Sequence, residues 1–183
     1  MSEKISEIMP FFGIVGDASA YGGGHINDSY ITDTSPRYIL QRINHNIFTK
    51  PEQVMENIIK VTEFLKKKII EKGGDPKRET LTVIYAKDGK SFIKTKQGNY
   101  FRMYEYIEGT TCYQTVENPI HFYNAAKAFG KFQNMLDDFP ANELFEVIPD
   151  FHDTKKRFEA FLKVLEEEKM SSKKCSLSLK EKA

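Results

Sequence analysis

The chain has 183 residues, of which 40% are hydrophobic and 29% charged, and its formal net charge is +1 at pH 7. This composition is that of a globular protein that buries a core, in one domain or in two small lobes. A nearly neutral chain offers no electrostatic footprint for nucleic acid or an anionic membrane, and no segment reaches membrane-spanning length. Cys112 and Cys175 have neither disulfide nor zinc spacing. We expect a soluble, cytoplasmic protein without nucleic-acid or membrane partners.

A glycine-rich stretch precedes the first predicted strands. Three glycines at 22–24 raise the question whether this stretch closes over a phosphate or is only a flexible turn. Two β-rich runs follow, at 29–32 and 37–44, and the turn-forming sequence DTSP joins them. This pattern predicts a β-hairpin directly after the glycines.

The next predicted element is a long helix at 49–72. Thr49 and Glu52 have the spacing of a capping box, and Pro51 falls in the first turn, where its missing N–H costs nothing. Apolar residues recur at helical spacing along the segment, and Gly73 and Gly74 end it. The helix therefore has one apolar face for a core.

The second half of the chain begins with strands and continues with helices. Runs at 80–86, 91–95 and 100–109 are separated by glycine turns, which predicts an antiparallel meander. An apolar stripe then predicts a helix from Pro119 to Leu136, made by Phe122, Ala125, Ala126, Phe129, Phe132 and Leu136. Another helix is expected after Asp153, and the last residues are poor in apolar side chains.

Six segments in the same order resemble the aminoglycoside phosphotransferase family, most closely its N-acetylhexosamine 1-kinase-like branch. They are GGGHINDSY, RYILQRIN, VMENIIKVTEFL, YFRMYEYIEGTTCY, FGKFQNML and IPDFHDTKKRF. The resemblance extends from about residue 11 to about residue 161. It implies an α+β, protein-kinase-like fold, in which an antiparallel-sheet nucleotide lobe with one helix leads into the first helices of a C-terminal lobe, left incomplete. The implied domains are a nucleotide lobe at 1–108, the start of a helical lobe at 109–168 and a loose tail at 169–183.

The implied activity is transfer of a phosphate from ATP to an amino sugar. Such an enzyme needs a catalytic Asp, an Asn about five residues later and a further Asp that binds magnesium. Five residues after Asp153 is Phe158, and the sequence beyond Phe158 contains no Asp. We therefore expect ATP binding, magnesium ligands in a missing half, and no catalysis by this chain alone. The alternative is a non-catalytic nucleotide-binding or complementation module that needs a second, C-terminal chain.

The resemblance implies a nucleotide site. Its residues in this sequence are Gly22, Gly23, Gly24, Asn27, Gln41, Arg42, Glu56, Met103, Glu105 and Ile107. The glycines would bring backbone N–H groups to the triphosphate, and Asn27 would shape the loop more than bind metal. The backbone of Glu105 and Ile107 would contact adenine, with Met103 or Tyr104 behind it.

The side chain that faces the phosphates has two candidates in adjacent positions. Arg42 stands roughly where related kinases have Lys or Arg, and Gln41 is the competing register, because alternation lets only one of them face the cleft. The acid on the helix is Glu52 or Glu56, and we favour Glu56 because it lies in the helix body. The plainer interpretations are a solvated strand charge for Arg42 and an ion pair with Lys60 for Glu56.

The segment PDFHDT looks like kinase metal-binding and catalytic sequences but lacks their continuation. We expect Asp153 to be a helix N-cap and His152 to be a packed or substrate-side residue.

Overall fold

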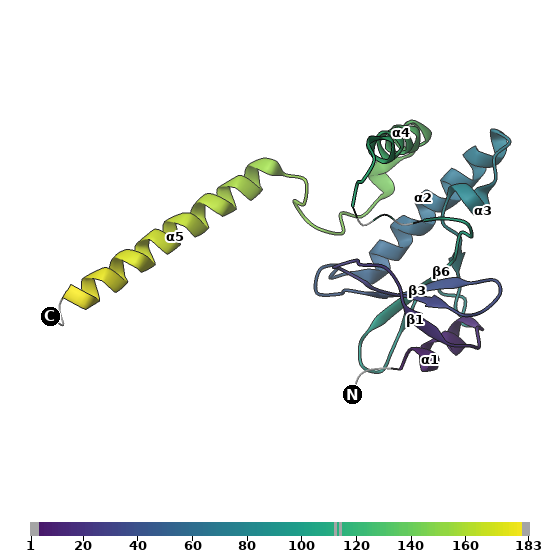
Figure 1. The fold of residues 1–183 in the computed structure, drawn as a ribbon, viewed down its shortest axis with the longest axis horizontal. Helices are drawn as coiled ribbons and strands as arrows, with labels where there is room; N and C mark the ends of the chain where they lie inside the picture. The colour runs from purple at the N-terminus through teal and green to yellow at the C-terminus, as the bar shows by residue number, and fades with distance from the viewer. Residues whose placement is uncertain (1–3, 112, 114, 181–183) are drawn as a thin grey trace. The chain divides into compact units, whose positions relative to one another are not determined.

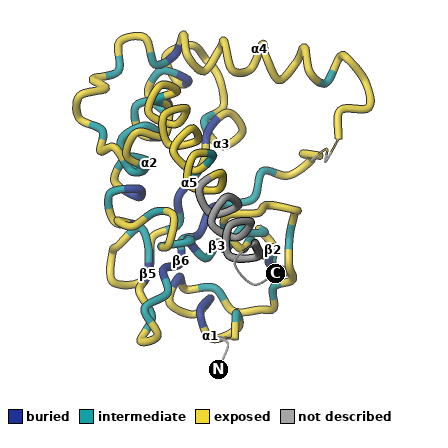
Figure 2. Tube along the Cα trace, turned by 90° about the vertical axis from the view of Figure 1, so that its left-hand side faces the viewer, coloured by how far each residue is buried: buried dark blue, intermediate teal, exposed yellow. Residues whose placement is uncertain are grey.

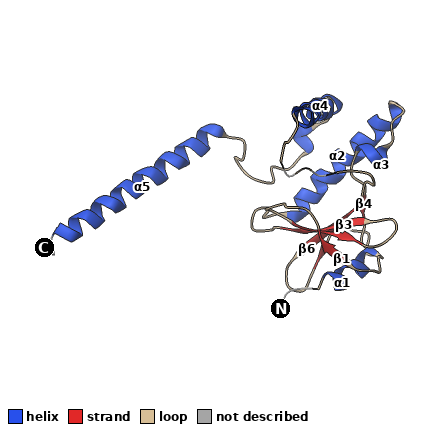
Figure 3. Cartoon of the chain, viewed as in Figure 1, coloured by secondary structure: helices blue, strands red, loops and turns tan. Residues whose placement is uncertain are grey.

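The computed structural model describes residues 4–111, 113 and 115–180 and has an α+β fold (Figures 1 and 3). Its elements are α1 (Ile5–Ile8), η1 (Met9–Phe12), β1 (Ala18–Ala20), β2 (Asp28–Thr32), β3 (Tyr38–Ile43), α2 (Pro51–Glu71), α3 (Pro76–Glu79), β4 (Val83–Ile84), β5 (Ile93–Lys94), β6 (Tyr100–Glu105), α4 (Pro119–Met135), η2 (Ala141–Glu143) and α5 (Thr154–Lys180). Within these ranges no helix is long and apolar enough to cross a membrane.

The six strands form one antiparallel sheet with the order β1-β2-β3-β6-β4, and β5 also pairs with β6. The hairpin expected after the glycines is β2–β3. The expected meander is wrong in one respect, because β4 pairs with β6 instead of with β5. Val83 lies opposite Tyr104 while Ile93 lies opposite Phe101, so the two short strands follow each other along one edge of β6. A turn closed by the bond from Ala86 N to Lys90 O, 2.8 Å, separates them.

The sheet is covered on both faces, by the N-terminal helices on one side and by α2 on the other (Figure 1). On the first face Leu40 and Met103 are fully buried and pack in one cluster with Met9 of η1. On the second face Ile43 packs in a cluster with Met55 of α2. Because side chains alternate along a strand, these two clusters assign every residue of β3 and β6 to one face or the other.

Helix α2 begins and ends close to the predicted positions. Its N-cap is Lys50, without a side-chain cap bond, so the capping box at Thr49 and Glu52 is not formed. The Glu52 carboxylate instead accepts a hydrogen bond from Tyr100 Oη at 3.0 Å, which ties the first turn to β6. After the helix, Gly73 has φ +72°, a left-handed conformation that favours glycine.

Helix α4 contacts α2 near its C-terminal end. Met135 is buried in a cluster with Leu65 and Ile69, and Leu136 is partly buried against that cluster. The rings of Phe64 and Phe139 meet edge to face, with centroids 5.1 Å apart. Most of the α4 surface is exposed (Figure 2).

The chain divides into two compact units, Met1–Val147 and Ile148–Ala183. α4 packs on α2 within the first unit, and the lobe boundary expected after residue 108 stays a prediction. The segment 169–183, expected as a loose tail, is helical up to Lys180 as part of α5, and residues 181–183 lie outside the described residues. Glu, Lys, Met and Leu favour a helix without tertiary packing, so local propensity accounts for this extension.

Candidate functional site

The glycine stretch is the loop between β1 and β2, closed by a hydrogen bond of 2.8 Å from Tyr21 N to Ser29 O. Gly22 has φ +77° and open space around its α-carbon, so the left-handed backbone is what requires glycine there. The Asn27 side-chain oxygen accepts a hydrogen bond of 3.0 Å from Asn44 N, just after β3. Asn27 therefore fixes the end of the loop against the next strand.

Gln41 and Arg42 lie on opposite faces of the sheet. Gln41 is on the α2 face, the face of Ile43, while Arg42 is on the face of Leu40 and the N-terminal helices. Arg42 Nε donates to Asp28 Oδ2 at 2.6 Å, and the two side chains form an ion pair that is about half exposed. Arg42 is thus turned away from α2.

The expected pair between Arg42 and an acid of α2 is not formed. Glu56 pairs with Lys60 one turn later in the same helix, at 3.1 Å, and Glu52 bonds to Tyr100. Arg42 is on the face of the N-terminal helices, whereas Glu52 and Glu56 belong to α2 on the other face. The sheet therefore stands between Arg42 and both acids.

A cation that does face α2 is Arg102 of β6, which the sequence analysis did not select. Arg102 lies directly opposite Gln41 across the β3–β6 ladder. Gln41 Oε1 accepts from Arg102 Nε at 3.1 Å and from Nη2 at 3.0 Å, and Gln41 Nε2 donates to Ser29 Oγ at 2.8 Å. A hydrogen-bonded row therefore crosses β2, β3 and β6 on the α2 face.

Arg102 is a partly buried cation whose described neighbours are neutral. Its Nη1 lies 4.0 Å from Met55 Sδ of α2, and its guanidinium lies 5.3 Å from the centroid of the Tyr104 ring. Within the described part of the chain, no carboxylate forms an ion pair with it. Burial lowers the pKa of Arg102 below its ordinary value, and the same burial raises the pKa of the Tyr104 phenol.

A sequence signal for Arg102 exists in strand alternation. In YFRMYE, Arg102 is two residues from both Tyr100 and Tyr104. Alternate residues of a strand point the same way, so the arginine shares the face of the two tyrosines. A charge on a face otherwise made of large apolar side chains is unusual for a strand with neighbours on both sides. Without the ladder register, however, the sequence does not pair Arg102 with Gln41.

Strand β6 places two of the predicted adenine-binding residues on opposite faces of the sheet. Met103 is fully buried in the cluster on the N-terminal-helix face, whereas Tyr104 packs on the α2 face with Gln41 and Arg102. Of the two alternatives, only Tyr104 therefore shares the face of the polar row. Glu105 N donates to Thr82 O at 2.9 Å, and Ile107 O accepts from Thr110 Oγ1 at 2.8 Å.

An aromatic contact brings the glycine loop beside the segment that follows β6. Tyr21, directly before Gly22, meets Tyr106 edge to face with centroids 5.9 Å apart. The Arg37 guanidinium lies 4.5 Å from the centroid of the Tyr106 ring, and Arg37 Nε donates to Glu108 Oε1 at 2.9 Å. This hydrogen bond and ion pair lower the pKa of the Glu108 carboxyl. The structure thus places the start of the loop beside Tyr106 and puts Gln41 on the α2 face, while Arg42 and Met103 lie on the opposite face.

In the second unit, Asp153 caps α5 as predicted: its Oδ1 accepts from Lys156 N at 2.9 Å. Asp150, which mimics a kinase metal ligand in the sequence, forms an ion pair with Lys156 at 2.6 Å. His152 meets the ring of Phe151 edge to face. Over the residues that the structure describes, no group of three His, Cys, Asp or Glu side chains is placed to hold a metal ion.

No family model matches the sequence. Among solved structures, the chain is similar to spectinomycin phosphotransferase, APH(9)-Ia, in complex with ADP and spectinomycin. The TM-score is 0.44 and the sequence identity is 16%, over 72% of this chain. The similarity covers 37% of the length of that phosphotransferase.

Proposed function

We propose that this chain binds a nucleoside triphosphate on the α2 face of its sheet, as the nucleotide-binding part of a kinase-like phosphotransferase. The observation that carries the proposal is Arg102, a partly buried cation held by Gln41 and without an acid among its described neighbours. Burying an unpaired charge is costly, and a bound anion would offset that cost. Phosphate oxygens accept strong, charge-assisted hydrogen bonds from a guanidinium.

The surrounding residues suit a triphosphate. Gln41 Oε1 takes two guanidinium donors and fixes the plane of the group, and the ladder sets Arg102 directly opposite Gln41. The β1–β2 loop with Gly22, Gly23 and Gly24 would supply backbone N–H groups to the phosphates, as in the kinase pattern. The backbone of Glu105 and Ile107, beside the loop through the Tyr21–Tyr106 contact, would receive the base.

The proposal also covers the phosphate acceptor and the transfer step. We infer an amino-sugar hydroxyl as acceptor, by the resemblance of the sequence to N-acetylhexosamine kinases. Transfer also needs a catalytic Asp, an Asn and a magnesium-binding Asp, and we assign none of these roles to a described residue. We therefore expect this chain alone to bind ATP without turnover, and to need a complementing polypeptide for transfer.

Isothermal titration with ATP and Mg²⁺ tests the binding site with a matched pair of arginines. Arg102→Gln should weaken binding by about 1.5–3 kcal/mol, tenfold to over a hundredfold in Kd, as for a lost charged hydrogen bond. Arg42→Gln, on the opposite face, should leave Kd within about twofold, which replaces the sequence-based expectation that Arg42 holds the phosphates.

Two further measurements keep the outcomes distinct. Gln41→Leu retains the arginine but removes its orienting acceptor, so it should weaken ATP binding while the thermal melt stays cooperative. Equal losses in the Arg42 and Arg102 variants, or no binding by the wild-type chain, would refute the site. A phosphotransfer assay with N-acetylglucosamine and N-acetylgalactosamine should give no product, and turnover would refute only the expected inactivity.

A further inference from the structure

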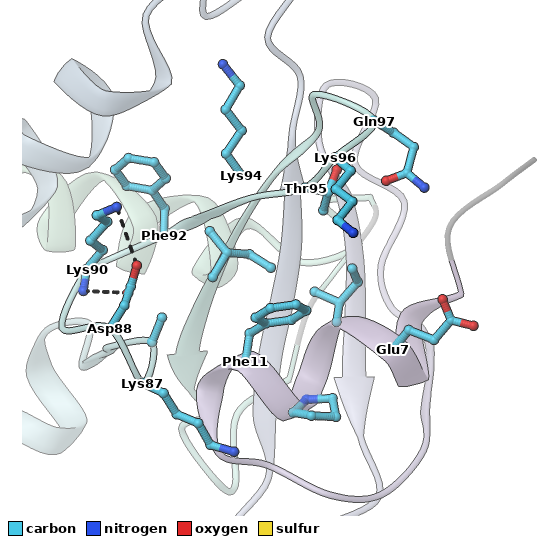
Figure 4. A pocket seen from close by; sticks show the side chains of 14 residues that line it. Glu7, Phe11, Lys87, Asp88, Lys90, Phe92, Lys94, Thr95, Lys96 and Gln97 are labelled. Carbon is cyan, nitrogen blue, oxygen red and sulfur yellow. Dashed lines mark hydrogen bonds and ion pairs between the residues drawn. The ribbon is translucent and has the colours of Figure 1, made fainter.

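A cavity of about 820 Å³ lies beside the N-terminal helices and the turns that flank β5, within the first unit (Figure 4). Small-molecule sites in proteins typically measure roughly 300–1,000 Å³. The cavity borders the cluster of Leu40 and Met103, on the sheet face away from α2. It is therefore separate from the row of Gln41 and Arg102.

The floor of the cavity is apolar and well packed. Ile8, Ala86 and Ile93 line it and are at most 9% exposed, because they belong to the main core cluster. Phe11 lies among the lining side chains in Figure 4, yet it is 55% exposed. An apolar ring or chain placed on this floor would cover Phe11 and gain the corresponding hydrophobic free energy.

The rim of the cavity has an excess of positive charge. Four lysines line it, Lys87, Lys90, Lys94 and Lys96, against the two acids Glu7 and Asp88. Two of the lysines already have neighbours: Lys90 pairs with Asp88 at 3.4 Å, and Lys94 Nζ lies 4.9 Å from the centroid of the Tyr100 ring.

Lys87 and Lys96 form no ion pair with any residue that the structure describes, and both are exposed at the rim. Their backbone positions are nevertheless fixed. Lys87 N donates to Phe11 O at 2.8 Å, and Thr95, next to Lys96, donates from its N to Asn99 O at 2.9 Å. The two ammonium groups therefore extend from anchored points around a rigid apolar floor.

We propose that this cavity binds a small molecule that joins an apolar ring or chain to an anionic group. The apolar part would rest on Phe11 and Ile93, and the anion would be held by Lys87 and Lys96. This pairing uses both the uncovered ring and the unpaired cations, which neither a neutral hydrophobe nor a bare inorganic anion would do. The site is independent of the nucleotide site and does not rest on it.

Naphthoate is a suitable probe, with the uncharged naphthol and inorganic phosphate as the two half-ligands. Amide NMR spectra of the full chain should show saturable shifts at Ile93, Thr95 and Lys96 on addition of naphthoate up to about 5 mM, a range that detects weak ligands. Each half-ligand should bind about tenfold more weakly or less, since it lacks one of the two interactions. Added ATP should not displace naphthoate.

Two variants locate the interaction. Lys87→Gln/Lys96→Gln should weaken naphthoate binding about tenfold or more, whereas Lys127→Gln/Lys155→Gln, which removes two exposed lysines elsewhere, should not. Phe11→Ala should weaken binding while leaving the backbone bond from Lys87 intact. Absence of saturable shifts at the cavity, equal binding by naphthol, displacement by ATP, or equal effects of the two double variants would overturn the proposal.

Discussion

Strand β6 and helix α4 have equally regular apolar patterns, yet they lie in opposite environments. Phe101 of β6 is 1% exposed, whereas Phe129 of α4 is 70% exposed. Spacing predicted the α4 helix and its apolar stripe, and Phe122, Phe129 and Phe132 on that stripe are exposed. Spacing therefore tells which residues share a side of an element, while burial depends on what packs against that side.

The difference follows from the neighbours of each element. β6 has strands along both edges and helices over both faces, so each of its side chains meets another layer. α4 meets α2 near its C-terminal end, through Met135. The two elements thus differ in what packs against them.

The largest expected effect comes from truncating one phenylalanine in each region. Phe101→Ala should lower the free energy of unfolding by about 3–5 kcal/mol, since it opens a cavity in the core. Phe129→Ala should change it by less than about 0.5 kcal/mol, as an exposed substitution does. Urea denaturation of the two variants measures both values. A loss at Phe129 comparable to that at Phe101 would mean that α4 is covered in solution.

A smaller effect is expected where α2 meets the segment after α4. The Asn57 side-chain amide donates to Phe145 O at 2.8 Å and accepts from Phe145 N at 2.9 Å, and Lys60 Nζ donates to Glu143 O at 2.9 Å. Asn57→Ala should destabilise the chain by about 1–3 kcal/mol, the sum of two net hydrogen bonds.

The matched control for this substitution is Gln53→Ala, one turn earlier in α2, whose side chain has no hydrogen bond to a described residue. It should cost less than about 0.5 kcal/mol. Hydrogen exchange around Phe145 should accelerate only in the Asn57 variant. Similar exchange in both variants would show that the amide contact does not hold the segment.

The smallest expected effect is a pH dependence from two ion pairs, one between α4 and α3 and one between α2 and the turn after α4. Hydrogen bonds from Lys131 and Lys68 lower the pKa of Glu79 and Asp138 below their ordinary values of 4.5 and 3.8. The stabilisation is thus fully present above about pH 4.5 and is lost as the pH falls through the lowered values. Both groups are exposed, so salt should weaken the effect.

Melting temperature measured against pH tests this dependence. Glu79→Gln/Asp138→Asn should flatten the acid side of the curve at low salt. Asp137→Asn removes a neighbouring exposed acid that forms no ion pair with the described residues, and it should leave the curve unchanged. A curve that does not respond to salt would argue against these pairs as its cause.

Much of the sheet and α2 could be predicted from the sequence, because their signals are local. The β2–β3 hairpin follows from a turn between two β-rich runs, and the length of α2 follows from its spacing and the glycines after it. The pairing of β4 with β6 was missed, since two-residue strands carry too little pattern to fix a partner. The short N-terminal helices were missed for the same reason.

The candidate site was predictable only in part. Strand alternation showed that Gln41 and Arg42 must face opposite ways, but only the position of α2 shows which of them faces that helix. Arg102 becomes a candidate only through its hydrogen bonds to Gln41, which is 61 positions away in the sequence. No local sequence pattern predicts a contact over that separation.

The place of β6 in the sheet has a consequence for synthesis of the chain. β6 is the last strand in sequence order, yet β3, β4 and β5 all pair with it. Until residues 100–105 leave the ribosome, β3 has an open edge and the apolar residues beside it lack their partner strand. An open strand edge is a template for pairing with other chains, so a pause in translation while β6 is still inside the ribosome would favour aggregation, and a pause after β6 has emerged would not.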